Sequence, residues 1–381
     1  MHGELTEVVM KCHFVLFGLV LALLGVCAGQ SVEAISPIKD APFSAEIHHR
    51  YANGEDLSES MEYVARSGNG SVYFAKVAQF GNFKGSISEI TVDDAPSKCR
   101  IRIRPFLSKV QRAESGRITG GMAEGGDVIL ELRQNVRPDL NSVDAVRESW
   151  RRTQPCRVDG AGSGGSHGEF RSLGERNVDG MILFGFHTEN ASDSPAHHVE
   201  DYWESDLGFT YSRTNTDFSG PTPKVSTLYV EKLKRGDPAP ELFTVQDKYL
   251  RPTSAFSKSN TVFISNSVGD LELQRRIESI LTASGRFTIV RNSRKADLSV
   301  ALRIDRQRDD RQAILTISKS PGTRPDLEIT RVWLIFPKKD APDQWAESPL
   351  VNTCFANVWA QLENVKAPTT PSDSPFLRDL Q

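Results

Sequence analysis

The chain has 381 residues, a net charge of −3 and 38% hydrophobic residues. This length suggests two or three domains, with enough apolar residues for packed cores. The near-neutral charge argues against a general nucleic-acid binder, because phosphate binding needs a basic surface.

The first thirty residues predict export. An unbroken apolar run, FVLFGLVLALLGVCA, covers residues 14–28 and follows Lys11. The run is too short to span a bilayer comfortably but suits the apolar core of a secretory signal. We therefore predict a signal peptide over residues 1–29, and we suspect that the true start is Met10. Two alternatives stay open: residues 14–28 as an uncleaved membrane anchor, and lipidation of Cys27.

Residues 30–252 are predicted to form a β-rich domain with antiparallel strands. The alternating runs lie at 43–51, 71–77, 86–92, 99–105, 127–133, 179–187, 199–204, 208–213 and 226–233. Two segments interrupt them. Residues 141–152 predict a short helix capped by Asn141 or Ser142, and residues 158–168, VDGAGSGGSHG, predict a flexible loop.

Residues 258–367 are predicted to form a smaller α+β domain. Strands are expected at 261–264, 287–291, 296–304, 313–319 and 329–336, with helices at 270–284 and 347–365. The order β-α-β-β-β-β-α predicts a sheet with both helices on one face. Residues 368–381 are rich in Pro and Ser and predict a disordered tail.

Three cysteines remain after signal removal: Cys99, Cys156 and Cys354. An oxidising compartment permits a disulfide between Cys99 and Cys156. Cys354 would then be unpaired, and its place on the apolar face of the last helix predicts a small buried hydrophobic residue.

Several segments of the β-rich region resemble a group of uncharacterised exported bacterial proteins. They are PFSAE at 42–46, LGERNVDGM at 173–181, YWESDLG at 202–208 and RGDPAPELFTVQDKYLRP at 235–252. The sheet order is also similar to the LolA-like lipoprotein-carrier half-barrel. That resemblance implies a curved antiparallel sheet that closes over a helix and holds an acyl chain or a partner segment. The Arg-bearing stretch at 100–117 and the glycine loop depart from it.

The second region resembles a different group of envelope proteins. The stretch SGRFTIVRNSRKADLSVAL at 284–302 is similar to the amino-terminal domain of TolB and to CsgG-like proteins. The resemblance implies a module for assembly or contact at the cell envelope, without enzymatic activity.

Three sets of candidate site residues stand out, each with a plainer structural interpretation. His187, His198 and Glu200 could bind a metal ion if neighbouring strands brought them together, although a polar, exposed strand explains them more simply. The alternating Arg100, Arg102 and Arg104 suggest an anion-binding strip, extended by Lys109 and Arg112, or the solvated face of a half-buried strand. The aromatic residues could line a cavity for an apolar ligand or form the sheet's core; they are Tyr202, Trp203, Phe209 and Tyr211.

Catalytic signatures are missing from the sequence. It contains no H-E-x-x-H motif, and neither a G-x-S-x-G nor an S-x-x-K motif that comes with a plausible partner set. The glycine run at 160–165 follows no clear strand and is closed by no Lys-Ser/Thr pair, so a linker explains it better than a phosphate loop. We expect no catalytic residues and no cofactor.

These patterns favour an exported, periplasmic or secreted envelope protein that is not an enzyme. It would bind an envelope protein or a lipid-like, apolar ligand through its curved sheet, with the second domain as a docking module. We expect no nucleic-acid partner and no stable transmembrane span after signal cleavage. The alternatives are a secreted metal-dependent hydrolase that uses the 187–201 cluster, and a purely structural envelope protein.

Overall fold

The structure is a computed structural model. It describes residues 35–77, 87–112, 118–132, 140–153, 158–161, 166–192, 197–244, 259–266, 270–306, 311–319, 328–336 and 345–364. The predicted signal segment, Cys156 and the tail after residue 367 lie outside these described residues. None of the described helices is both long enough and apolar enough to cross a membrane.

The chain divides into two compact units, each built from two stretches of sequence. Unit 1 combines residues 1–70 with 135–238, and unit 2 combines 71–134 with 239–381. This division differs from the contiguous ranges 30–252 and 258–367 expected from the sequence. The physical reason is a long-range pairing within unit 2, where residues 330–335 align in parallel with 126–131.

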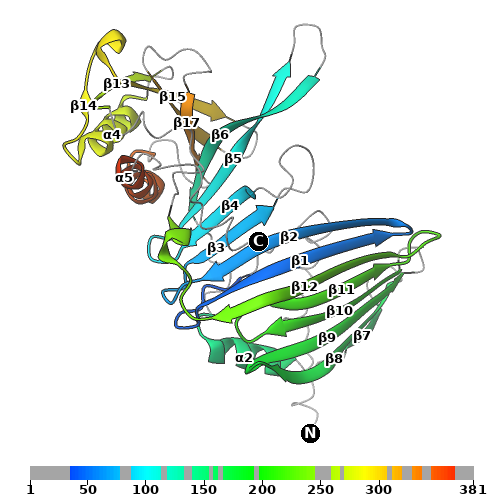
Figure 1. Cartoon of the computed structure of the whole chain (residues 1–381). Coiled ribbons are helices and arrows are strands. Elements are labelled where there is room, and N and C mark those ends of the chain that lie inside the picture. The colour runs from blue at the N-terminus through cyan, green and yellow to red at the C-terminus, as the bar shows by residue number, and fades with distance from the viewer. Residues whose placement is uncertain are drawn as a thin grey trace. The chain divides into compact units, whose positions relative to one another are not determined.

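The described residues of unit 1 form an antiparallel sheet and one helix (Figure 1). Its strands are β1 (Phe43–Asn53), β2 (Asp56–Arg66), β7 (Val158–Ala161), β8 (Ser166–Val178), β9 (Met181–Ser192), β10 (His197–Ser205), β11 (Thr210–Asp217) and β12 (Lys224–Arg235). They pair in the order β7-β8-β9-β10-β11-β12-β1-β2. The helix is α2 (Val143–Thr153), and the Ser142 hydroxyl accepts a hydrogen bond from the Ala145 amide at 3.1 Å, as a helix N-cap does.

The two faces of this sheet differ, and α2 distinguishes them. Trp150 of α2 packs against Phe186 of β9, with ring centroids 5.1 Å apart. Phe186 lies opposite Tyr202 of β10, and both belong to a buried aromatic cluster with Phe170 and Phe184. We call this side of the sheet the helix face and the other side the open face. Because side chains alternate along a strand, the register assigns every residue to one face.

A buried arginine holds the sheet and its connecting segments together in unit 1. Arg66 at the end of β2 is fully buried. Its guanidinium donates to the carbonyl oxygens of Ala41 (2.7 and 3.0 Å), Ser36 (2.9 Å) and Leu207 (2.6 Å). Its charge also lies over the Phe43 ring, 4.9 Å from the centroid. Arg66 therefore joins β2 to the segment before β1 and to the turn between β10 and β11.

Unit 2 contains a mixed sheet. Its strands are β3 (Val72–Val77), β4 (Ile87–Asp94), β5 (Cys99–Arg112), β6 (Ile118–Leu132), β13 (Thr261–Asn266), β14 (Thr288–Ile289), β15 (Leu298–Arg306), β16 (Arg311–Lys319) and β17 (Glu328–Phe336). They pair in the order β3-β4-β5-β6-β17-β16-β15-β13-β14. The β6–β17 and β13 pairings are parallel, and the others are antiparallel.

The described helices of unit 2 include the two predicted ones and two short 3-10 helices that were not predicted. They are η2 (Pro240–Phe243), α4 (Leu271–Thr282), η4 (Ser293–Lys295), the π-helical turn η7 (Leu350–Phe355) and α5 (Ala356–Asn364). Asp270 caps α4 by accepting a hydrogen bond from the Leu273 amide at 2.9 Å. The apolar stripe predicted for the last helix is buried throughout, and its Trp359 packs against Phe287, with ring centroids 5.5 Å apart.

The α+β fold class with a large antiparallel sheet is therefore confirmed, with two local corrections. The loop predicted over 158–168 is wrong in part: Val158–Ala161 form β7 and pair with Phe170–His167 of β8. Its glycines misled the prediction, although Gly160 and Gly168 lie opposite each other in the ladder. Strand β2 was not predicted, because its first residues, Asp56–Glu59, are all exposed and Leu57 is the one apolar residue among them, so they carry no hydrophobic alternation.

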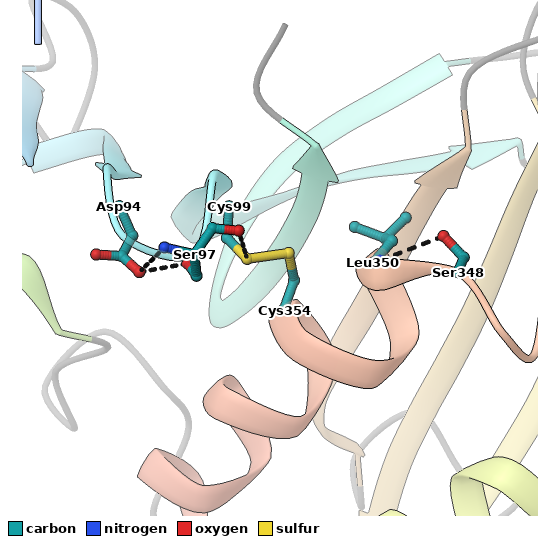
Figure 2. Close-up of a disulfide and its surroundings, with 6 residues drawn as sticks. All are labelled: Asp94, Ser97, Cys99, Ser348, Leu350 and Cys354. Atoms are coloured by element: carbon teal, nitrogen blue, oxygen red, sulfur yellow. Dashed lines mark hydrogen bonds between the residues drawn. A yellow bond between two sulfur atoms is a disulfide. The ribbon is translucent and has the colours of Figure 1, made fainter. Parts of the chain in front are cut away.

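The disulfide prediction also has to be corrected (Figure 2). Cys99 is bonded to Cys354, at a sequence separation of 255 residues. Cys354 is therefore not the unpaired residue that we expected, although it is buried as predicted. The prediction failed because the parallel pairing of β6 with β17 brings η7 to the start of β5, and the sequence does not reveal that pairing. The bond links the β4–β5 turn, where Asp94 accepts hydrogen bonds from Ser97, to η7.

Candidate functional site

The sheet of unit 1 is tightly packed around β9 but exposed to solvent at β11 and β12. In β9, six of the seven residues from Met181 to His187 are buried, on both faces of the sheet. By contrast, every residue of β11 and β12 is half-buried or exposed. These two strands lie inside the sheet, between β10 and β1, so each of their faces keeps access to solvent. We call the helix-face surface of β11 and β12 and the adjoining parts of β10, β1 and β2 the uncovered surface.

Ion pairs cross the uncovered surface. Arg213 of β11 donates to the carboxylate of Glu200 on β10, and Glu200 is buried. On the neighbouring strands His49 Nε2 lies 2.9 Å from Glu62 Oε2. Leu228 of β12 lies between Arg213 and His49 in the register. The surface therefore combines fixed charges with apolar side chains.

The four aromatic candidates do not line one cavity. Tyr202 belongs to the aromatic cluster beneath α2, where burial raises its pKa. Phe209 is buried against Phe43, with ring centroids 4.7 Å apart. Tyr211 is half-buried on β11. Two of the four residues, Tyr202 and Phe209, therefore form core, and the ligand-binding role stays a prediction.

Trp203 lies on the open face, whereas its neighbour Tyr202 lies on the helix face. It pairs with Gly185 of β9, where an added Cβ atom would stand 2.7 Å from the indole ring. The Arg176 guanidinium lies over the indole ring, 3.8 Å from its centroid. Trp203 therefore packs closely against a glycine backbone and stacks with an arginine, contacts that the sequence did not reveal.

The predicted metal residues also divide between the two faces. His198 and Glu200 share the helix face, as expected from their spacing, while His187 pairs with Asp201 on the open face. His187 Nδ1 lies 2.7 Å from Asp201 Oδ1, and Glu189 Oε1 lies 2.9 Å from His197 Nε2. The sheet therefore does not bring His187, His198 and Glu200 together, and metal binding by this set stays a prediction without geometric support.

The three arginines of the predicted anion strip face carboxylates in unit 2. Arg100 contacts Asp93 with two hydrogen bonds of 2.7 and 3.0 Å. Arg102 donates to Glu131, and Arg104 donates to Glu89 at 3.0 Å. These cross-strand ion pairs account for the alternating pattern in β5. Anion binding by the strip stays a prediction. The side chains of Lys109 and Arg112 lie outside the described residues.

One group of polar side chains on the open face was not predicted from the sequence. Glu46 and His48 of β1 and Glu231 of β12 each place a ligand atom within 4.8 Å of the others. Glu46 and His48, two residues apart in β1, were the only signal in the sequence. Glu231 is distant in sequence and joins them through the β1–β12 register, in which it lies opposite Glu46.

Comparisons with known proteins identify similar folds. No family model and no curated protein matches the chain. Among solved structures, a LolA-superfamily protein of Nitrosomonas europaea is 12% identical, with a TM-score of 0.20, over 54% of this chain and 91% of its own. The Pseudomonas aeruginosa MucA/MucB complex is 10% identical, with a TM-score of 0.26, over 73% of this chain and 71% of the matched chain.

A β-barrel-like protein of unknown function from Brucella abortus is 12% identical, with a TM-score of 0.27, over 52% of this chain and all of its own. A LolA-superfamily protein and a β-barrel-like protein are thus among the structures that this comparison finds. The likeness concerns the fold alone, and the function is argued below from the residues of this chain. The TolB-like and CsgG-like resemblance of residues 258–367 stays a prediction.

Proposed function

We propose that this chain is an exported binding module that receives a segment of a partner protein on its uncovered surface. The observation that carries the proposal is the exposure of β11 and β12. Interior strands of a sheet normally bury at least one face against a second layer. Here both interior strands keep all their side chains at least partly exposed, so a partner can supply the missing layer.

The chemistry of the uncovered surface favours a polypeptide over an acyl chain. An acyl chain needs an apolar cavity, because burying unpaired polar groups against hydrocarbon is costly. The apolar part of the helix face, around Phe186 and Tyr202, is already filled by Trp150 of α2. The remaining surface carries the Glu200–Arg213 and His49–Glu62 pairs, which suit the mixed polar and apolar groups of a peptide.

Two features support export. Residues 14–28 have the composition of a signal core. In addition, the Cys99–Cys354 bond belongs to an oxidising compartment, since disulfides rarely persist in the cytosol. Both features agree with a periplasmic or secreted location, where a non-enzymatic binding module would meet an envelope partner.

Native mass spectrometry of the mature chain, purified from the host's envelope fraction, tests the proposal. We expect a complex whose additional mass is a polypeptide that survives organic extraction. An additional mass that the extraction removes and that is identified as acyl lipid would establish the carrier function instead. A bare chain, recovered even after mild cross-linking of the envelope, would count against a stable partner.

A further inference from the structure

We propose that Glu46, His48 and Glu231 form a binding site for a divalent transition-metal ion, with zinc as the best match. The site lies on the open face of unit 1, so it is independent of the uncovered surface on the helix face. All three residues project from the paired strands β1 and β12, in which Glu46 is opposite Glu231 and His48 is opposite Tyr229. Their backbone is therefore fixed by the sheet before any ion binds.

The distances at His48 are unusual for hydrogen bonds. His48 Nε2 lies 3.5 Å from Glu46 Oε2 and 3.5 Å from Glu231 Oε2. An N–H···O hydrogen bond to a carboxylate is normally about 2.7–2.9 Å long. His48 Nε2 is a buried atom and, among the described residues, no hydrogen-bond partner reaches it. A buried polar atom without a hydrogen-bond partner is commonly explained by a bound water molecule or ion.

A zinc ion between the three atoms explains the spacing. Zinc binds histidine nitrogen and carboxylate oxygen at about 2.0–2.2 Å in tetrahedral geometry. Two ligands of such a tetrahedron are then roughly 3.3–3.6 Å apart. Both carboxylate distances from His48 Nε2 fall in this range, and the side chain of Glu231 is 49% exposed, so it can adjust to complete the set. A water molecule would take the fourth position.

The surroundings of the site support ion binding by orienting the ligands. Lys232 Nζ lies 2.9 Å from Glu46 Oε1, which leaves Oε2 directed at His48. The His48 ring stacks on Tyr229, with centroids 5.2 Å apart and planes 12° apart. Such outer contacts hold metal ligands in place and raise affinity.

A β-bulge builds this arrangement. The register of β1 and β12 shifts between Ser44 and Glu46. Lys232, on β12 at the shift, has a φ of 48°, a left-handed conformation that is uncommon for lysine. Bulges re-aim side chains, often beside functional sites. Here the bulge turns Lys232 toward Glu46, while Glu231 still faces the pair on β1.

Titration of the mature chain with zinc, monitored by calorimetry in a buffer without chelators, tests the site. The wild-type chain should bind one zinc ion, and His48→Gln should weaken that binding at least about 10-fold, because losing a ligand costs no less than losing an outer contact. Glu231→Gln should weaken binding in the same direction. The matched control is His49→Gln, which removes the neighbouring histidine on the helix face; His49 is 27% exposed and His48 25%. This control should bind zinc like the wild type.

Thermal unfolding supplies a second measurement that does not depend on calorimetry. Zinc should raise the melting temperature of the wild type and of His49→Gln, because an ion that binds only the folded state stabilises it. It should leave the melting temperature of a folded His48→Gln unchanged. The proposal is overturned if the wild type binds no zinc saturably, or if His49→Gln loses as much affinity as His48→Gln.

Discussion

Replacing Cys354 by alanine is expected to lower the free energy of unfolding by about 2–5 kcal/mol. The Cys99–Cys354 bond closes a loop over a sequence separation of 255 residues, and a disulfide stabilises mainly by restricting the unfolded chain, more so for longer loops. Both sulfur-bearing residues are buried, so the loss also removes packing between β5 and η7. Urea denaturation under non-reducing conditions measures the effect.

Three further variants make this prediction specific. Cys99→Ala, and the double variant that lacks both cysteines, should lose about as much stability as Cys354→Ala, because all three remove the same bond. Cys156→Ala leaves the Cys99–Cys354 bond intact and should lose little by comparison. If Cys156→Ala were as unstable as Cys354→Ala, or if a non-reduced digest contained Cys99 linked to Cys156, the pairing seen here would be wrong.

Replacing Arg66 by methionine should destabilise unit 1 by about 3–5 kcal/mol, as breaking a buried charged network does. The substitution leaves the carbonyl oxygens of Ser36, Ala41 and Leu207 without their donor. Burial lowers the pKa of Arg66 to about 9, partly opposed by Asp206. Arg66 therefore keeps its charge at neutral pH, and Asp206 would lose a nearby cation.

Chemical denaturation followed by circular dichroism measures this loss against two comparison variants. Arg66→Lys should lie between the wild type and Arg66→Met, because one ammonium cannot reproduce the planar set of donors. Arg50→Met is the matched control. Arg50 is 52% exposed and pairs with Glu59 on the surface, so its loss should destabilise the protein much less than the loss of Arg66. Equal losses for Arg66→Met and Arg50→Met would contradict the anchoring role.

Local patterns in the sequence predicted much of the secondary structure. Alternation located β1 and most other strands, and the helical stripe around Cys354 and Trp359 is buried as expected. The predictions that failed, the domain ranges and the disulfide, depend on pairing between segments that are distant in sequence. The parallel alignment of β6 with β17 joins segments that the sequence places in separate domains. It also decides which cysteine meets Cys99.

The site residues show the same limit. The spacing of His198 and Glu200 correctly placed them on one face, because that inference needs only the alternation of one strand. Placing His187 beside them required the register of β9 and β10, which puts it opposite Asp201 instead. Glu231 joins Glu46 and His48 through a bulged register that no local pattern announces.

Site-directed photo-cross-linking from two adjacent residues of β11 tests the binding function most directly. Asn215 lies on the helix face opposite Glu200, and Thr214 lies on the open face opposite Asp201. A photoreactive side chain at each position, activated in the host's envelope, samples one face while the strand stays the same. If a partner binds on the uncovered surface, we expect a discrete protein adduct from position 215 and none from position 214. An adduct from position 214 alone, or equal adducts from both positions, would contradict binding on the uncovered surface.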